Sequence, residues 1–387
     1  MAWLGLKTLA YVPLTRSNVP SDVPPPDWAN QIMQRVYDDI DSKKTLVDRS
    51  LRAYIRTVSS GMADIQVDVR PQETIAGTGA GGTDVPPDAL EARLGNQLRA
   101  LGYDGAAIVM LGGPGGGSTT GYWSRFSMLD DHGVWVGEIV HQTNLCNLPD
   151  LFDFTDEFPD ENMGVYDQEA GYGYTHFSVW TKRAIGWLNP STVPLHAGHS
   201  ANYTLHSASL IQPPPVGRVA AVQVGTQVPY LMIEARTQAD QFDINIPKDG
   251  VIVYQVQTSD PLGNAQNSMP PLNLLTKTGL PAGQSFTSAN QVVVKVGSAV
   301  AGGFSITVTN NALGTVPGVL GETEPTASQH IKAAGFVPKF VAAHKPAAAR
   351  GAVGVVKKLV VESQSPVGGA PAHLGTVVTC TMAADDP

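Results

Sequence analysis

The sequence predicts a mixed α/β fold in its N-terminal half, then a β-rich region, then a small α+β segment at the C-terminal end. Two apolar runs, KTLAYVPL (7–14) and AAIVML (106–111), read as buried strands. Between them lie segments whose apolar residues recur at helical spacing, as in an α/β layer architecture. From about residue 200, short strand patterns alternate with turn residues. Frequent glycine (40) and proline (29) also favour turns over long helices.

The elements expected in the first part follow in order. DWANQIMQRVYDDI has apolar residues at helical spacing, and Asp27 is placed to cap the N-terminus of that helix. A second helix is expected over 48–61, and the alternating pattern of 62–70 predicts a half-exposed strand. DALEARLGNQLRALGYDG predicts a third helix that ends near Gly102.

The β-rich region is expected to form a sandwich or to extend a sheet. Its strand patterns are ANYTLHSASL, RVAAVQVG, YLMIEARTQ, GVIVYQVQT, QVVVKVG and FSITVTN. The last segment carries one short helix, in TVPGVLGETEPTASQHIKAAG, followed by KLVVESQSP and TVVTCTM as strands. The predicted domains are therefore residues 1–199, 200–312 and 315–385.

Composition excludes some partners. A net charge of −9 argues against a nucleic-acid backbone as partner, and no apolar run is long enough to predict a membrane span. The start, MAWLGLKTLAYVPL, lacks the features of a signal peptide, so we expect a cytoplasmic protein or one whose leader is absent from this sequence. Cys146 and Cys380 lie in distant segments and are expected to be unpaired.

The glycine-rich stretch LGGPGGGSTTG (111–121) follows a buried strand, where a phosphate-binding loop would lie. Ser118 stands where that loop requires a lysine, which argues against nucleotide binding. The chain also has no G-x-S-x-G motif, so a serine esterase of the α/β-hydrolase type has little support. A loop at the rim of a cleft is the preferred interpretation.

The stretch VWVGEIVHQTNL contains half of the zinc-hydrolase motif H-E-x-x-H. In that motif two histidines bind the ion, and the glutamate accepts a proton from the metal-bound water. Glu138 and His141 have the required spacing and would share one face of a helix, but Gly137 occupies the position of the first histidine. A hydrogen-bonded Glu–His pair without a metal is the simpler alternative.

An acidic stretch, DLFDFTDEFPDE (150–161), follows this segment. It does not match an EF-hand, and a solvated loop is the ordinary outcome for such a composition. Its carboxylates nevertheless make it a candidate calcium site, with Asp153, Asp156 and Asp160 as ligands.

The order of GEIVH, LPDLFDF, NMGVYD and HFSVWTKRAIGWLNP resembles that of the immune-inhibitor-A-type secreted metallopeptidases. The resemblance covers about residues 5–310 and includes SLRAYIRTVSSGMADI upstream and YLMIEARTQADQFDINIPKDGVIVYQVQ downstream. It implies that Glu138 is the general base, that His141 and Asp150 are zinc ligands, and that Met163 lies beneath the metal.

Two departures from the family pattern weaken that zinc site. Gly137 replaces a ligand, and the link QTNLCNLP between His141 and Asp150 is longer than the family's and lacks its glycine. Zinc binding then needs a substitute ligand, for which the candidates are His132, Cys146, Asp153 and His176.

The tail resembles a PASTA module, through VPGVLGETEPTASQHIKAAGF and VESQSPVGGAPAHLGTVVTCTM. Its expected thin core consists of Ile331, Leu359, Val361, Val377 and Val378. Such modules usually lie outside the bacterial cell and contact peptidoglycan or neighbouring domains. This resemblance implies a secreted or cell-surface bacterial protein.

Three hypotheses of function follow. The leading one is a secreted bacterial metallopeptidase-like hydrolase that acts on amide or ester bonds, in peptide, protein or ester substrates, through an altered zinc site. The second is an inactive peptidase homologue that binds cell-wall or peptide ligands. The third is a metal-independent hydrolase that uses Ser118, Glu138 and His141 in the same cleft.

Overall fold

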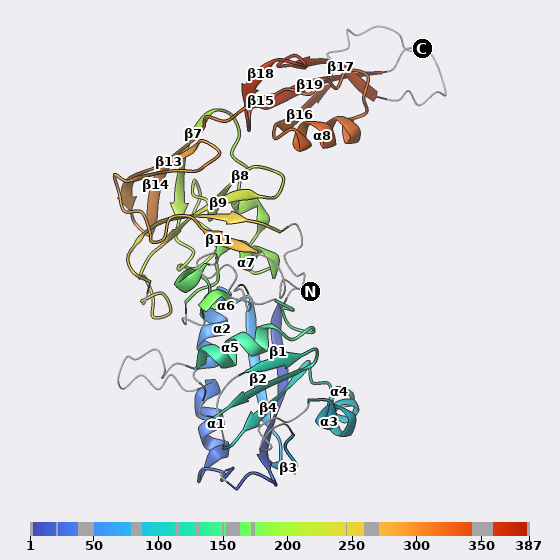
Figure 1. Cartoon of the computed structure of the whole chain (residues 1–387), viewed down its shortest axis with the longest axis vertical. Coiled ribbons are helices and arrows are strands. Elements are labelled where there is room, and N and C mark those ends of the chain that lie inside the picture. The colour runs from blue at the N-terminus through green and yellow to red at the C-terminus, as the bar shows by residue number, and fades with distance from the viewer. Residues whose placement is uncertain are drawn as a thin grey trace.

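The computed structural model shows a mixed α/β protein with several sheets and few helices. It describes residues 3–20, 22–37, 50–78, 87–112, 117–128, 130, 132–148, 151, 163–171, 175–244, 246–258, 271–342 and 359–384. Three parts follow one another along the long axis of the molecule, in the order of the chain (Figure 1). They are an α/β part, a part with two four-stranded sheets, and a small C-terminal module.

The α/β part is built on a six-stranded sheet with the order β2-β1-β4-β6-β5, in which β3 also pairs with β1. Its strands are β1 (Gly5–Arg16), β2 (Ala63–Val69), β3 (Glu73–Ile75), β4 (Gly105–Met110), β5 (Ser118–Thr120) and β6 (Trp123–Ser127). All the pairs are parallel except β5 with β6. Both faces of β1 and β4 are covered, which explains the continuous apolar runs of these two strands.

Helices cover both faces of this sheet. On one face lie α1 (Trp28–Tyr37), α2 (Leu51–Val58) and α5 (His132–Val140), which share a core with Leu9 and Tyr11 of β1. On the other lie α3 (Pro87–Leu90), a π-helical turn η3 (Glu91–Gly95) and α4 (Asn96–Ala100), which pack against Ala10 and Val12. Side chains of β1 thus alternate between the two cores, as strand geometry requires.

The helix starts differ in how they are capped. At α2, the Ser50 side chain accepts the N–H of Ala53, which is the usual role of an N-cap serine. Asp27 precedes α1 as predicted, and its backbone carbonyl accepts the N–H of Gln31. The predicted side-chain cap is wrong, however, because the Asp27 carboxylate accepts from the side-chain amide of Asn30.

The second part is a β-sandwich. One sheet contains β8 (Ala221–Val224), β9 (Tyr230–Arg236), β10 (Gly250–Val256) and β11 (Leu272–Leu274). The other contains β7 (Ser200–His206), β12 (Ser285–Thr287), β13 (Val292–Val300) and β14 (Gly303–Asn310). Apolar residues of both sheets meet in one cluster, including Ile233 and Val253 from the first sheet and Val294 and Ile306 from the second.

Short helical segments cover the outer face of the first of these sheets. They are η4 (Gly164–Tyr166), α6 (Gln168–Gly171), α7 (Val179–Ala184) and η5 (Pro190–Thr192). Met163 and Trp180 share a buried cluster there with Met232 and Tyr254. Residues before and after the predicted boundary at 199 therefore pack into the same core.

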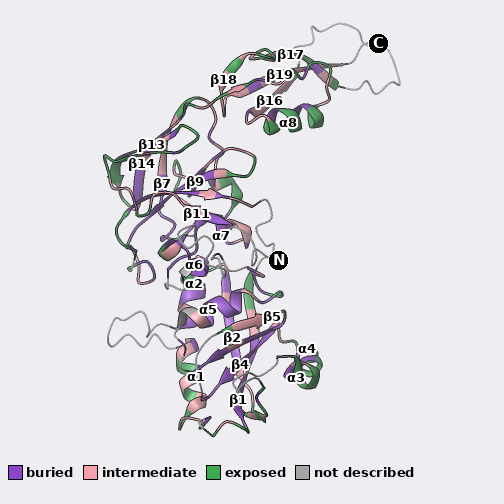
Figure 2. Cartoon of the chain, viewed as in Figure 1, coloured by how far each residue is buried: buried purple, intermediate pink, exposed green. Residues whose placement is uncertain are grey.

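The C-terminal module contains the predicted short helix, α8 (Glu324–Ala333), and the two predicted strands, β17 (Leu359–Ser365) and β19 (Val377–Ala384). The structure adds β16 (Val337–Ala342), which pairs with β19, and a small sheet of β15 (Leu313–Thr315) and β18 (Pro371–His373). Ile331, Val361 and Val378 are buried as expected, but Leu359 is 56% exposed, so its placement in the core is wrong. Figure 2 shows the outer face of α8 exposed.

No helix in the part of the chain that the structure describes combines the length and apolarity needed to cross a membrane.

Candidate functional site

Helix α5 carries Glu138 of the partial zinc motif, and His141 is the first residue after its end. Its apolar side chains, among them Trp135 and Ile139, are buried in the core of the α/β part. Just beyond its end, the buried Gln142 side chain donates to the carbonyl of Ala106 and the hydroxyl of Ser124, which ties the helix end to β4 and β6. Burial and these hydrogen bonds hold the C-terminal turn of α5 against the sheet.

The Glu138 carboxylate lies against β5, the last strand in the order of this sheet. Glu138 is only 5% exposed, and its Oε2 accepts a hydrogen bond of 2.6 Å from the hydroxyl of Thr119. On its other side is Gly117, where an added Cβ would lie 2.1 Å from Glu138 Oε1. The absence of a side chain at Gly117 therefore makes room for the carboxylate.

Each nitrogen of the His141 ring lies near an oxygen atom. Its Nδ1 lies 2.7 Å from the backbone carbonyl oxygen of Leu148, and because a carbonyl oxygen only accepts, Nδ1 must carry a proton. Its Nε2 lies 3.3 Å from Oε2 of Glu169, whose side chain is fully buried. A proton on one of the two groups, or a metal ion between them, is needed there, because a bare nitrogen lone pair would otherwise face a carboxylate oxygen.

Glu169 is the site residue that the sequence does not reveal. It lies on the four-residue helix α6, which packs against α5 where the α/β part adjoins the β-sandwich (Figure 1). Asp167 anchors this segment, since its carboxylate accepts the N–H of Ser178 and the hydroxyl of Thr181. The backbone carbonyl of Glu169 also accepts the N–H of Leu151. No spacing rule links Glu169 to His141, so only the folded chain brings them together.

The other residues predicted for the site either belong to other surroundings or lie outside the described residues. Met163 is buried in the cluster that covers the first sheet of the sandwich. Ser118 precedes Thr119 on β5, so strand alternation directs its side chain to the face away from Glu138. The predicted metal ligands Asp150, Asp153, Asp156 and Asp160 and the side chain of His132 lie outside the described residues.

The two cysteines, Cys146 and Cys380, are both free, as predicted. Cys146 is buried, and burial raises the pKa of its thiol, which makes it a poor metal ligand in its neutral form.

His176 belongs to a different, buried cluster of charged residues. Its Nε2 lies 2.7 Å from Oδ2 of Asp240, and its Nδ1 lies 3.0 Å from the Nζ of Lys182. Nearby, the guanidinium of Arg236 donates to both carboxylate oxygens of Asp243, and both side chains are fully buried. This cluster connects the segment around α7 with the sandwich.

The donors at His141 fit part of a zinc site. Within the described ranges, no three His, Cys, Asp or Glu side chains come together in a group that could hold a metal ion. Two donors do fit, because ligands about 2.1 Å from a tetrahedral zinc ion stand about 3.4 Å apart, and the His141 and Glu169 atoms are 3.3 Å apart. A ligating histidine also typically donates its other ring N–H to a carbonyl, as His141 does to Leu148.

No protein-family model matches the chain, and no curated protein is significantly similar to it.

Proposed function

We propose that this chain is a secreted bacterial hydrolase of amide or ester bonds, with Glu138 as general base and a zinc ion held by His141 and Glu169. The observation that carries the proposal is the contact of 3.3 Å between His141 Nε2 and Glu169 Oε2, with Nδ1 of the same ring fixed on the Leu148 carbonyl. The resemblance to secreted metallopeptidases supports the same residues, except that Glu169 joins or replaces Asp150 as a ligand.

The bound metal would supply a water molecule of lowered pKa and would polarise the carbonyl of the substrate. Glu138 would take up the proton from the attacking water and later deliver it to the leaving group. The hydroxyl of Thr119, 2.6 Å from Glu138 Oε2, orients the carboxylate for this task. The carbonyl of Leu148 keeps the proton of His141 on Nδ1, so Nε2 can serve as a ligand.

The position of β5 favours a peptide substrate. This three-residue strand is the last in the described sheet order, and its middle residue, Thr119, contacts Glu138. An extended peptide laid along β5 would pass beside the carboxylate, which is a common mode of peptide recognition. The PASTA-like segment 315–385 would add contacts to peptidoglycan and retain the protein at the cell surface.

The test combines metal analysis with hydrolysis assays. After exchange into metal-free buffer and addition of zinc, we expect about one zinc per chain by mass spectrometry. His141→Ala and Glu169→Gln should each lose it. Glu138→Gln should keep the zinc but lose at least about a hundredfold in the hydrolysis of peptides or esters. Glu324→Gln, an exposed glutamate on α8, is the matched control. A chain that takes up no zinc, or a Glu138→Gln variant with full activity, would refute the proposal.

A second candidate function is favoured by Gly137. This buried position on α5 offers no side chain to bind a metal. The alternative is therefore an inactive peptidase homologue that no longer uses zinc and only binds peptide or cell-wall ligands. It predicts no turnover, and ligand binding that survives chelation. The same elemental analysis would detect calcium held by the acidic residues Asp153, Asp156 and Asp160.

A further inference from the structure

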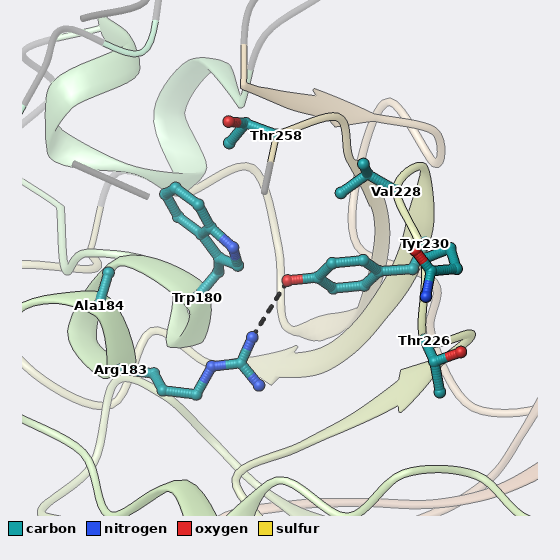
Figure 3. Close-up of a pocket in the computed structure, with 8 residues that line it drawn as sticks. Trp180, Arg183, Ala184, Thr226, Val228, Tyr230 and Thr258 are labelled. Carbon is teal, nitrogen blue, oxygen red and sulfur yellow. Dashed lines mark hydrogen bonds between the residues drawn. The ribbon is translucent and has the colours of Figure 1, made fainter. Parts of the chain in front are cut away.

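A small pocket lies between α7 and the turn that joins β8 to β9 (Figure 3). Its volume is about 310 Å³, and its main walls are Trp180 and Arg183 on one side and Val228 and Tyr230 on the other. None of the residues that line it belongs to the candidate zinc site. The volume is at the lower end of the range for small-molecule sites, which corresponds to a ligand the size of one amino-acid residue.

The pocket contains a cation whose hydrogen-bond partners are neutral. The Arg183 guanidinium donates through Nη1 to Oε1 of Gln223, at 3.0 Å, and through Nη2 to the hydroxyl of Tyr230, at 3.1 Å. None of the ion pairs found among the described residues includes Arg183. A guanidinium has five N–H donors, so these two bonds leave further donors for an anion.

The surroundings hold this guanidinium in place. The amide of Gln223 donates to the carbonyl of Gly225, at 2.9 Å, which leaves its oxygen directed to Arg183. Gly225 has φ of +102°, a conformation that favours glycine, and its turn brings Tyr230 back toward α7. The hydroxyl of Thr226 donates to the carbonyl of Lys332 at the end of α8, so the C-terminal module steadies the turn from its other side.

Aromatic and apolar groups form the rest of the pocket. Trp180 and Arg183 are three residues apart on α7 and so share one face of the helix. The Trp180 side chain is only 3% exposed and forms a rigid wall, whereas Val228 is 38% exposed and lies at the rim. A single cation beside flat apolar surfaces suits a monoanion with an aromatic body better than a phosphate or a neutral sugar.

We propose that this pocket binds the carboxylate of a small acylated amino acid or of a peptide C-terminus whose last side chain is aromatic or large and apolar. Arg183 receives the carboxylate, and Trp180, Tyr230 and Val228 contact the side chain. Binding at this site requires neither zinc nor hydrolysis, so it stands apart from the function proposed above.

The test is calorimetric titration of the full chain with N-acetyl-L-phenylalanine and, as the neutral control, with its amide. The acid should bind saturably and at least about tenfold more tightly than the amide. Arg183→Gln should remove that preference, whereas Arg56→Gln, at an exposed arginine on α2, should leave it unchanged. Equal affinity for acid and amide, no saturable binding of the acid, or a folded Arg183→Gln variant that binds as the parent does would each overturn the proposal.

A second pair of variants covers the case in which Arg183→Gln does not fold. Val228 lies at the exposed rim, so charges are tolerated there. Val228→Glu should weaken binding of the acid and Val228→Lys should strengthen it, with little effect on the amide. Affinities for the acid that do not change in opposite directions would place the ligand elsewhere.

Discussion

His141 and Glu169 meet at 3.3 Å although one follows α5 and the other lies on the short helix α6. The contact joins the α/β part to the segment that covers the β-sandwich, so it depends on the packing of both. The same two atoms suit a zinc ion or a protonated histidine paired with a carboxylate. A further metal-binding side chain nearby would strengthen zinc binding but would not strengthen a His–Glu ion pair. Substitutions at neighbouring positions therefore distinguish the two states.

Restoring the missing histidine is the most direct of these variants. Gly137→His places an imidazole one helical turn before His141, and we expect zinc affinity to rise by at least about tenfold if Glu138 and His141 face a metal site. Isothermal titration with zinc measures the change. Gly137→Ala is the control, because it raises helix propensity by about 1 kcal/mol without adding a ligand. Equal affinities for the two variants would mean that position 137 is out of reach of the ion.

The space beside Glu138 gives a second prediction. Gly117→Ala would place a methyl group 2.1 Å from Glu138 Oε1, so the carboxylate must move. Hydrolysis should fall by about tenfold or more, and zinc content should change little because His141 and Glu169 are untouched. The melting temperature should fall, because the Cγ of the buried Glu138 would also lie 2.4 Å from the added methyl group and the whole side chain must shift.

Ser118→Ala, one residue further along the chain, is the matched control for that experiment. Its side chain lies on the other face of β5, so activity should be retained. Loss of activity in Ser118→Ala without loss of zinc would instead support metal-independent chemistry at Ser118.

A buried ion pair between Arg236, at the end of β9, and Asp243, in the connection to β10, predicts how the stability changes in acid. Burial alone would raise the pKa of Asp243, but the Arg236 guanidinium, with His176, outweighs burial and lowers that pKa to about 2. The folded pKa thus lies below the unfolded value of about 3.9. The resulting stabilisation, on the order of 2 kcal/mol, is present above pH 4 and is lost as the pH falls through 2.

Asp243→Asn tests this stabilisation. The variant removes the carboxylate to which Arg236 donates two hydrogen bonds and leaves Glu234, at 3.5 Å, as the charged partner of the buried guanidinium. It should lose about 3 kcal/mol in the free energy of unfolding at pH 7. Its remaining stability should depend less on pH between 4 and 2 than that of the parent. Urea unfolding at a series of pH values measures both effects, with the exposed Asp249→Asn as control. A variant as stable as the parent at pH 7 would contradict the assignment.

Much of the α/β layer is predictable from local patterns. The strands β1 and β4 appear as apolar runs because both of their faces are buried, and α2 appears because its apolar residues recur at helical spacing before a glycine. The sequence does not reveal β16, whose VPKFVA pattern is only partly buried and contains a proline and a lysine. The prediction that Leu359 lies in the core is wrong because this residue begins β17 at an exposed position.

The candidate site is predictable only in part, for a physical reason. The spacing of Glu138 and His141 predicts that both belong to one site, and the structure shows the first against Thr119 of β5 and the second against Glu169. Glu169 reaches His141 through tertiary packing, which leaves no periodic signal in the sequence. The charged cluster around Arg236 is hidden in the same way, because buried charges look like surface residues until their partners are known.

Lys182 gives the last prediction, in alkaline solution. Its ammonium group is buried and donates to the Ala208 carbonyl, at 2.7 Å, and lies 3.0 Å from Nδ1 of His176. Burial, together with the charge of Arg236, lowers the pKa of Lys182 from 10.5 to about 8. Between these two pH values the unfolded chain binds more protons at this residue than the folded chain, so this lysine makes the free energy of unfolding rise with pH.

Lys182→Met keeps the length of the side chain and removes the charge. Relative to this variant, the parent should gain on the order of 3 kcal/mol in the free energy of unfolding between pH 8 and pH 10.5. Paired urea titrations of parent and variant isolate this residue, because the tyrosines and other lysines titrate in both proteins. A difference that stays constant across this pH range would mean that Lys182 keeps an ordinary pKa and that its burial is relieved by water.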